Sequence, residues 1–456
     1  MDQLCDWRSN NMVDRISQLP DAVLASILSR LSVREAAATS VMSRRWEKLW
    51  TFITRLNFDA SKTLDEIELD HTTCEMEKSG YIRWVNQVLD LHQSSIISMF
   101  RVCFPLKQSS KSDIDRWLEI VMGKKKKVER FELNLKDLDP CFNPSNYYVF
   151  PYEVLVSPTH FKSLECLTNL CLKFVNVSEQ VLEYFLSNCP LEQLSVGYST
   201  DLVNLRVTSP CHKLKYLTIC CCWKLEKILI SAPNLVSFKY RGSQIDLPLN
   251  CFPLLVEAYI GANSSSAFGG FYYGNICYAF RQLSSILPRL ESLTLETNPT
   301  EAKFLFQGPP QLTFLPESNY LPPLRKLKRL VLRVYANDYN NLLGFTSLIK
   351  ASPNLHEFVL KLHLSETGKP REVATAPRCP HMRLKVVELI GFVGHALDVE
   401  LAEYLLEKAI NLEKITINTC HPILIGTPFE FDESEERRAA RDRAMELRTK
   451  LRQGAE

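Results

Sequence analysis

Cysteines are the residues of this chain that most readily suggest metal binding or nucleophilic chemistry. The stretch TICCCWKL carries Cys220, Cys221 and Cys222 in a row. If this stretch is a β-strand, Cys220 and Cys222 share one face and Cys221 points to the other, so the three thiolates cannot bind one zinc ion. We therefore expect buried thiols here and not a metal centre.

A second set of possible metal ligands lies in the C-terminal part of the chain: Cys379, His381, Cys420 and His421. These four residues could meet only if adjacent segments bring them together, and their spacing does not require it. The start, MDQLCDWRSNNM, lacks the apolar core of a signal peptide, so the 15 cysteines are expected to stay reduced. The sequence thus predicts neither a metal site nor a cofactor.

Two stretches have compositions that suggest phosphate or nucleic-acid binding. GANSSSAFGGFYYGNICY (261–278) is rich in glycine and serine but lacks the lysine and the helix start of a phosphate-binding loop, so we expect a mobile insertion that makes contacts through its tyrosines. GKKKKVERF (123–131) follows a helical pattern, and basic residues are favoured at the negative end of a helix. A nuclear signal or a nucleic-acid patch is the alternative for this second stretch.

Recognisable catalytic motifs are absent: the sequence has no G-x-S-x-G, P-loop, G-x-G-x-x-G, H-E-x-x-H or C-x-x-C. We therefore expect no enzyme. The 54 basic and 52 acidic residues give a net charge of +2, which favours neither nucleic acid nor an anionic membrane as partner. No run approaches the ~18–20 apolar residues of a membrane span, and the expected location is the cytosol, the nucleus or both.

The elements that would position any site begin with a helical segment, DRISQLPDAVLASILSRLSVREAAATSVMSRRWEKLW (14–50). Pro20 suits a helix start, and apolar residues follow it at helical spacing. Ser32 and Glu35 form a capping box that begins a second helix, and a third is expected from Val41 to Trp50. Three helices in ~40 residues cannot cover so much apolar surface. The segment therefore either docks on the rest of the chain or binds a partner.

This segment resembles the F-box of plant F-box proteins in its Leu-Pro pair at 19–20, in Ile27-Leu28 and in SRRWEKLW at 43–50. Ser32 departs from that pattern, where plant relatives usually carry proline. The resemblance implies that the segment binds the Skp adaptor of a Skp–cullin–F-box ubiquitin ligase and, through it, cullin. The residues expected to bind the adaptor are Leu19, Pro20, Leu24, Ile27, Leu28, Leu31, Val41, Trp46 and Leu49.

A second pattern, L-x-x-L-x-L or a close variant, recurs with starts at 167, 191, 214, 235, 255, 290, 327, 355, 384 and 412. Most of the intervals fall in or near the ~20–29-residue period of leucine-rich repeats, in which each unit contributes one parallel strand to a solenoid. Two earlier strands, FRVCF (100–104) and FELNL (131–135), bracket the helical DIDRWLEIVM and are expected to begin the array.

Half-repeats at LVNLRV (202) and LEKILI (225) are too close to their neighbours to be further strands of the main sheet. We expect them to form strands on the back of the arc. Beyond residue 280 the units lengthen, and YAFRQLSSIL, LLGFTSLIKAS and VELAEYLLEKA predict helices there. The fold class is thus α/β: a three-helix F-box followed by a curved leucine-rich-repeat solenoid with a parallel concave sheet.

The C-terminal units (384–417) resemble the FBD-type region of plant F-box/leucine-rich-repeat proteins. The chain is therefore divided into a flexible N-terminus (1–12), the F-box (13–52), linker helices (53–97), the solenoid (98–420, with the FBD-like region at 355–420) and a charged tail (421–456). Acidic residues precede basic ones in FEFDESEERRAARDRAMELRTKLRQ, as the helix dipole favours, so a solvated terminal helix is expected.

The predicted function is that of a substrate-recognition subunit, which binds the adaptor through the F-box and a target protein through the arc. In L-x-x-L-x-L the residues between the leucines face outward from the core, which places candidate target contacts on the inner face. Two alternatives are a ligase-independent repeat scaffold and a receptor that uses a small-molecule co-ligand. The candidate target-binding residues are Lys215, Tyr216, Lys239, Tyr272, Tyr273, Lys328 and Arg329.

Overall fold

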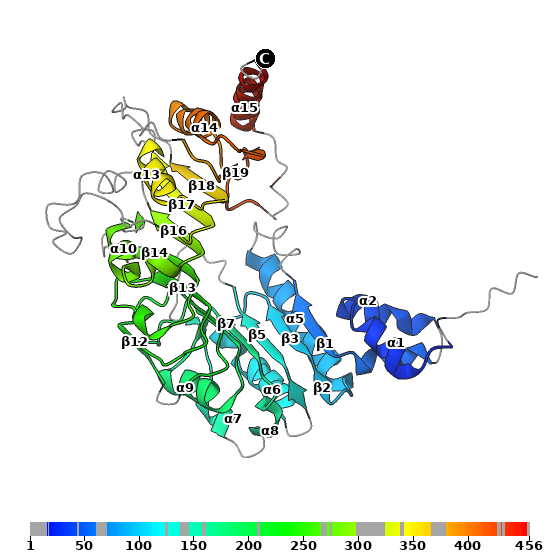
Figure 1. The fold of residues 1–456 in the computed structure, drawn as a ribbon. Coiled ribbons are helices and arrows are strands. Elements are labelled where there is room, and N and C mark those ends of the chain that lie inside the picture. The colour runs from blue at the N-terminus through cyan, green and yellow to red at the C-terminus, as the bar shows by residue number, and fades with distance from the viewer. Residues whose placement is uncertain are drawn as a thin grey trace, which may run out of the picture.

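The computed structural model describes residues 16, 18–42, 45–60, 71–123, 126–136, 146–156, 161–207, 210–265, 271–273, 276–297, 324–337, 342–365, 380–425, 430 and 434–453. The chain forms an arc with a small helical unit attached at its N-terminal end (Figure 1). The predicted flexible N-terminus, residues 1–12, lies outside the described residues.

The helical unit consists of α1 (Asp21–Leu28), α2 (Val33–Ala38), η1 (Thr39–Val41), α3 (Trp46–Leu49) and η2 (Trp50–Phe52). The predicted capping box is confirmed, because the Ser32 hydroxyl accepts from the Glu35 amide and the Glu35 carboxylate accepts from the Ser32 amide. The predicted third helix is instead divided into short pieces. Thr39 and Thr51 flank the predicted range, and their hydroxyls donate to the carbonyl oxygens of Ala36 and Lys48, which competes with regular helix bonding at its two ends.

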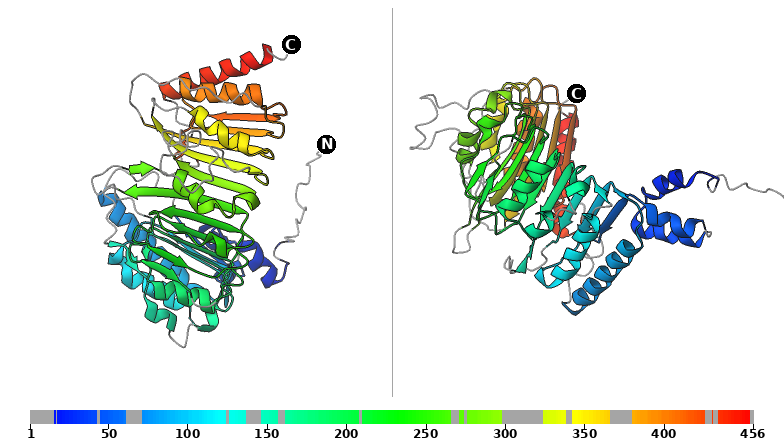
Figure 2. Two further views of the ribbon diagram at one scale, coloured as in Figure 1. Left: turned by 60° about the vertical axis from the view of Figure 1, so that its left-hand side comes forward. Right: turned by 90° about the horizontal axis from the view of Figure 1, so that it is seen from below.

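One long sheet forms the inner side of the arc, and its thirteen successive strands are all parallel and in register (Figures 1 and 2). Polar and apolar residues alternate along each strand, so one face contacts the core and the other is open. The strands, in order, are β1 (Arg55–Asp59), β3 (Met99–Cys103), β5 (Arg130–Asn134), β7 (Asn169–Lys173), β9 (Gln193–Gly197), β11 (Tyr216–Cys220), β13 (Ser237–Gly242), β14 (Glu257–Ser265), β16 (Ser292–Thr297), β17 (Arg329–Asn337), β18 (Glu357–Ser365), β19 (Val386–Ile390) and β20 (Lys414–Asn418).

The outer side of the arc is built from helices, short 3₁₀ turns and pairs of short strands (Figure 1). The predicted back strands are confirmed, since β10 (Asn204–Arg206) pairs with β12 (Lys227–Leu229) in a separate parallel sheet. The pairs β2 (Ile96–Ile97) with β4 (Lys127–Val128), and β6 (Tyr148–Val149) with β8 (Val175–Asn176), repeat this arrangement.

The helices of the outer side include those predicted from the longer C-terminal units. They are α5 (His71–Leu91), η3 (Gln108–Ser110), α6 (Lys111–Val121), α7 (Tyr152–Val156), α8 (Phe161–Leu164), α9 (Glu179–Asn188), η5 (Leu249–Cys251), α10 (Ile276–Leu283), η6 (Leu287–Arg289), η7 (Leu342–Phe345), α13 (Thr346–Ala351) and α14 (Ala396–Lys408). None of the helices in the described ranges combines the length and the apolar character needed to cross a bilayer.

Two segments differ from the sequence-based prediction. Residues 53–97, predicted as linker helices, contain β1, which pairs with β3 and forms the first strand of the array ahead of FRVCF. Its five residues alternate in polarity but lack the repeat motif, so pattern matching misses it. The insertion at 261–278 includes a hairpin in which β14 pairs antiparallel with β15 (Phe271–Tyr273).

A single apolar core runs through the molecule, from Leu24 and Leu28 of α1 to Leu447 of the terminal helix α15 (Glu435–Gln453). The predicted solvated helix is therefore partly docked: Ala440 and Leu447 are buried, and Arg443 Nη1 donates to the Gly394 carbonyl oxygen at 2.6 Å. The charge pattern predicted the helix, but its few apolar residues gave no sign of the contact. The helical unit and α15 thus shield the two ends of the solenoid.

Candidate binding surfaces

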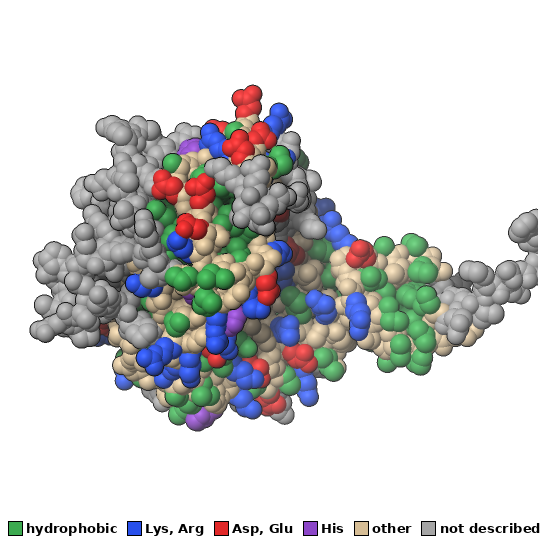
Figure 3. Space-filling model, turned by 45° about the horizontal axis from the view of Figure 1, so that its top comes forward, with side chains coloured by type: hydrophobic (Ala, Val, Ile, Leu, Met, Phe, Trp, Pro, Cys, Tyr) green, Lys and Arg blue, Asp and Glu red, His purple; other side chains and the backbone are tan. Residues whose placement is uncertain are grey.

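Helix α1 has two apolar sides with different environments. Leu24 and Leu28 are buried in the core, whereas Val23, Ile27 and Leu31, which follow one another at four-residue spacing, are about two-fifths exposed. Figure 3 shows hydrophobic side chains gathered over this unit, at the right of the view. More exposed still are Ile16, Val41 and Met42, at 57%, 88% and 64% of their full area. A large apolar patch on a monomer typically marks an interaction surface.

The predicted adaptor-binding residues therefore fall into two groups. Pro20, Ile27, Leu31 and Val41 are exposed, and Leu19 is half-buried. Four others lie in the core and present almost no surface in this structure, and their contact with an adaptor stays a prediction: Leu24, Leu28, Trp46 and Leu49.

Sequence reasoning left out Val23, Met42, Ile16 and Phe52, all of which are exposed. Val23, Ile27 and Leu31 share one side of a helix by their spacing alone, so that signal could have been found. Which side of α1 faces solvent depends on packing.

Arg45 fixes the start of α1 relative to α3. Its guanidinium bonds the Asp21 carboxylate through Nε at 2.9 Å and Nη2 at 2.6 Å, and Nη2 also donates to the Leu19 carbonyl oxygen at 2.5 Å. Both nitrogens donate to the same oxygen, Oδ1, and two charge-assisted hydrogen bonds restrict orientation more than a single contact does. The exposed apolar side of α1 is thereby held on a fixed backbone.

Polar contacts join the helical unit to the solenoid. The Thr54 amide donates to the Ser29 hydroxyl at 2.9 Å, and His92 Nε2 contacts the Ile53 carbonyl oxygen at 2.9 Å. Lys126 Nζ lies 3.0 Å from His92 Nδ1, so the imidazole is neutral, with its proton on Nε2. The pKa of His92 is lowered to about 4, chiefly by burial and also by the charge of Lys126, against the opposing effect of the hydrogen bond to Ile53. Lys126 of the predicted basic stretch therefore has a structural role.

Ion pairs between neighbouring coils engage most of the predicted target-binding cations. Lys215 lies 3.1 Å from Glu192, and Lys328 lies 2.8 Å from Glu291. Lys239 and Arg329 likewise contact Glu257 and Glu357, at 3.5 and 2.9 Å. These pairs are largely exposed, and such pairs contribute only about 0–1 kcal/mol each, so they remain available to a partner.

The predicted aromatic contacts lie at separate places. Tyr216 is exposed on the inner face of β11. Tyr272 and Tyr273 belong to β15, at the end of the extended β14. Tyr216 follows Lys215 in the chain and lies on the strand next to that of Lys239, whereas β15 pairs with the end of β14.

A buried carboxylate, which sequence reasoning missed, lies at the middle of the inner face. Glu296 of β16 is 2% exposed, and its oxygens bond Arg241 Nε at 2.9 Å, the Tyr259 hydroxyl at 3.0 Å and the Tyr335 hydroxyl at 2.7 Å. Burial, and after it Glu296 itself, raises the pKa of both tyrosines, so both hydroxyls donate. Burial alone would lower the pKa of Arg241, but Glu296 raises it above its ordinary value.

Beyond this cluster, ring contacts connect the last coils. Tyr335 stacks on His363 with ring centroids 4.5 Å apart, and His421 meets His363 edge to face at 5.1 Å. Burial, and next the charge of His421, lowers the pKa of His363 to about 4. His363 is therefore neutral near pH 7 and can donate one hydrogen bond without adding charge.

Three residues just after consecutive strands have left-handed backbone conformations: Phe174, Tyr198 and Cys221, with φ of 55°, 61° and 55°. Each amide donates to a carbonyl oxygen at the end of the next strand or one residue before it, as in Phe174 to Gly197 at 3.0 Å and Cys221 to Arg241 at 2.5 Å. The rings of Phe174 and Tyr198 stack with centroids 4.0 Å apart. Cys221 thus leaves the strand, in contrast to the predicted alternation, and burial raises its pKa to about 11.

Comparison with known proteins places these surfaces in a family. The family model described as "At1g61320/AtMIF1, LRR domain" matches residues 88–445, and the F-box domain model matches residues 16–55. The chain belongs to the plant F-box/leucine-rich-repeat family. The predicted resemblance and the predicted fold are both confirmed.

Named relatives of this F-box/leucine-rich-repeat protein come from Arabidopsis thaliana. F-box/FBD/LRR-repeat protein At5g22660 is 26% identical over 90% of both chains. F-box/LRR-repeat protein At3g58900 is 33% identical over 54% of this chain and 79% of its own length. The solved TLR13–ssRNA13 complex aligns with 66% of this chain and 39% of that one at 13% identity, with a TM-score of 0.29, an overlap too loose to bear on function.

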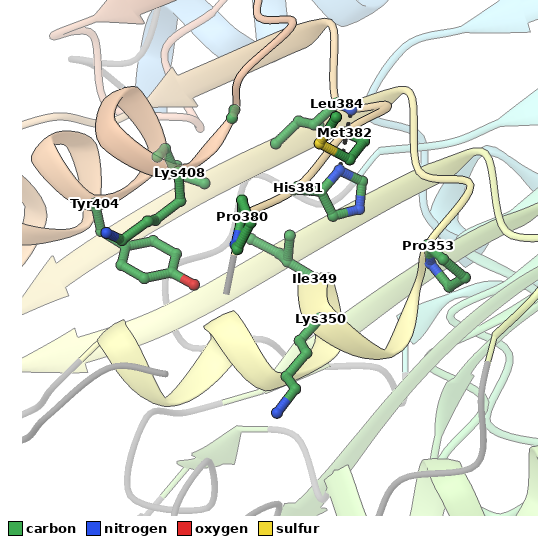
Figure 4. A pocket seen from close by; sticks show the side chains of 11 residues that line it. Ile349, Lys350, Pro353, Pro380, His381, Met382, Leu384, Tyr404 and Lys408 are labelled. Carbon is green, nitrogen blue, oxygen red and sulfur yellow. Dashed lines mark hydrogen bonds between the residues drawn. The ribbon is translucent and has the colours of Figure 1, made fainter. Parts of the chain in front are cut away.

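The F-box/leucine-rich-repeat chain also has a pocket of about 160 Å³ between α13 and α14 (Figure 4). His381 lies against it, with Nε2 at 2.8 Å from the Ser352 carbonyl oxygen and Nδ1 accepting from the Leu384 amide at 3.0 Å. The Nε2 contact joins neighbouring coils and the Nδ1 contact closes a local turn, so both ring nitrogens are engaged. Cys379, predicted as a possible companion of His381, lies outside the described residues. Within the described ranges, no group of three or more His, Cys, Asp or Glu residues is placed to hold a metal ion.

Proposed function

We propose that this chain is the substrate-recognition subunit of a Skp–cullin–F-box ubiquitin ligase. The exposed apolar side of the F-box would bind the Skp-type adaptor and, through it, cullin, while the inner face of the arc would bind a target protein. The observation that carries the proposal is the exposed apolar surface formed by Val23 and Ile27 of α1 and by Leu31 just after it, while the opposite side of α1 completes the core.

Such a subunit breaks and forms no bonds itself. It raises the effective concentration of a target lysine near the conjugating enzyme, an entropic contribution that needs only a rigid connection between two binding surfaces. The continuous core from α1 to α15 supports this role because it holds the F-box in a fixed orientation to the arc. The cytosol, the nucleus or both are the proposed place of action.

The test combines Ile27→Asp with Leu31→Asp, which places one charge on the exposed side of α1 and one just after it, and leaves Leu24 and Leu28 untouched. The matched control is Leu229→Asp, because Leu229 is 53% exposed on the back of the solenoid. We expect co-purification of adaptor and cullin with the full chain to fall at least tenfold in the double variant and to stay unchanged in the control.

Circular dichroism and thermal melting of both variants verify that the chain remains folded. Unchanged adaptor recovery in a folded double variant would show that the F-box surface lies elsewhere. Recovery of adaptor without cullin from the unmodified chain would instead favour a ligase-independent scaffold.

A further inference from the structure

The third inward-facing position of the central strands forms a row across the sheet. Strand register places Lys173, Arg241, Glu296, Arg333 and Lys361 in this row, with Gly197, Cys220 and Gly261 between them. Four members of the row are cationic and one is acidic. With four cations and one carboxylate, the row has a net positive charge.

Glu296 does not neutralise any cation of the row other than Arg241. Its side chain has no exposed surface, and Arg241 and two tyrosine hydroxyls bond its oxygens. Gly261 allows this arrangement, since a Cβ at that position would overlap Glu296 Oε2. The carboxylate and Arg241 thus neutralise each other, which leaves Arg333 and Lys361 facing solvent.

Arg333 and Lys361 are direct neighbours in register on β17 and β18 and are partly exposed. Neither forms an ion pair with any residue that the structure describes. Burial, and after it the charge of Arg333, lowers the pKa of Lys361, while Glu388 opposes this shift. The Arg333 guanidinium also lies 5.8 Å from the centroid of the Tyr259 ring. Two adjacent like charges without an ion pair are unfavourable in the free protein, and an anion between them would offset that repulsion.

Several other inner-face cations contrast with this pair. Arg101 bridges Asp59 and Glu132 at 2.8 and 3.2 Å in the first coils, and Lys239 and Arg329 contact glutamates of the next strand. Within the row, the cations that form no ion pair among the described residues are therefore Arg333, Lys361 and, further along, Lys173.

We infer that the row around Arg333 and Lys361 binds an extended acidic segment of the target protein, rich in aspartate or glutamate. This inference rests on the proposed function. Adjacent strands lie ~4.8 Å apart, so Arg241 and Lys361, four strands apart, are separated by roughly 19 Å along the sheet. An extended peptide of about six residues covers that length. The arginine fork suits a carboxylate, and His363 beside the row adds one neutral hydrogen-bond donor.

The surroundings favour an acidic peptide over nucleic acid. Glu257 on β14 and Glu357 on β18 lie two inward-facing positions, that is four residues, before the row. Glu388 lies on β19, the strand next to β18. The positive region is therefore narrow. A nucleic-acid groove needs a longer basic track with rings free for base stacking. The hydroxyls of Tyr259 and Tyr335 are instead committed to Glu296.

The test measures fluorescence anisotropy of a labelled ten-residue polyglutamate peptide with the full chain at low salt, with a ten-nucleotide single-stranded DNA and a polylysine peptide as comparison probes. The variant is Arg333→Gln with Lys361→Gln. The matched control, Lys224→Gln with Lys227→Gln, removes the same charge from exposed positions on the back of the arc. We expect polyglutamate affinity to fall at least tenfold in the first variant and to change less than twofold in the control.

Equal loss in both variants, or no polyglutamate binding by the unmodified chain, overturns the inference. The inference is also overturned if the DNA binds more tightly than polyglutamate and this binding depends on Arg333 and Lys361. Adaptor co-purification with the same variants separates this inference from the proposed function. If the unmodified chain recovers adaptor but does not bind polyglutamate, the proposed function stands and the acidic-segment site is refuted. If it binds polyglutamate but does not recover adaptor, the ligase role is refuted.

Discussion

At the scale of single residues, the centre of the inner face depends on a glycine. Gly261 lies between Arg241 and Glu296, and a methyl group there would overlap the carboxylate and lie 3.3 Å from Arg241 Cγ. Glu296 is fully bonded in its present position, so it cannot move aside without leaving a buried charge unpaired. The glycine is required by space and not by backbone conformation.

Gly261→Ala is therefore expected to lower the free energy of unfolding by roughly 1–3 kcal/mol, the range for overpacking a filled site. The measurement is the urea midpoint of the full chain. Gly80→Ala is the control, because Gly80 lies in α5 with open space around its Cα. Alanine there should raise the free energy of unfolding by about 0.5–1 kcal/mol. A Gly261→Ala chain as stable as the unmodified one would show that the cluster rearranges freely.

At the scale of elements, the junction between the F-box and the solenoid is a polar contact built on a neutral histidine. His92 follows α5, accepts a hydrogen bond from Lys126 before β4, and donates to Ile53 after η2. Three elements thus meet at one imidazole. Protonation would place a second positive charge against Lys126, so acid should weaken this junction.

Because the pKa of His92 is about 4 in the folded chain and 6.5 is its ordinary value, the unfolded chain binds the extra proton first. The stability contributed by neutral His92 is thus present above pH 6.5 and is lost as pH falls toward 4. At pH 5 the loss from this residue is about 2 kcal/mol relative to pH 7. We expect His92→Gln to reduce the difference between urea midpoints at pH 7 and pH 5. An unchanged pH dependence in that variant would contradict a neutral, buried His92.

At the scale of the whole molecule, both ends of the solenoid are covered by elements that are not repeats. The F-box packs against β1 and α5, where Arg34 lies 4.6 Å above the ring of Trp84. At the other end, α15 contributes Leu447 to the common core. A parallel sheet with open ends exposes unpaired backbone groups and apolar coils, so such covers keep a solenoid soluble.

Deletion of residues 384–456 should expose β18 as an edge strand and cause aggregation together with a lower melting temperature. Deletion of residues 434–456 is the control, because it removes α15 and leaves β19 and β20 in place; it should remain monomeric with a smaller loss of stability. Size-exclusion chromatography and thermal melting provide the measurements. A monomeric 384–456 deletion that melts like the full chain would show that the last coils are a separate unit.

The sequence by itself determined the repeat architecture. Leucines at fixed spacing and alternate polarity dictate a strand in each unit, and units of this length can bury their leucines only by stacking in parallel. The ten motif starts therefore match ten consecutive strands, from β7 to β20. The F-box, its capping box and the back strands at 204–206 and 227–229 were likewise visible as local patterns.

Only the tertiary structure decided which side of α1 stays exposed, because Leu24 and Ile27 look alike in sequence and differ only in what packs on them. The same holds for the Glu296 cluster. Its members come from β13, β14, β16 and β17, and Glu296 reads as one charged residue among many. Strand register brings them together, and the absence of a side chain at Gly261 allows the carboxylate to be buried. Contacts between distant strands leave no periodic pattern in the sequence, which is why the sequence did not predict this cluster.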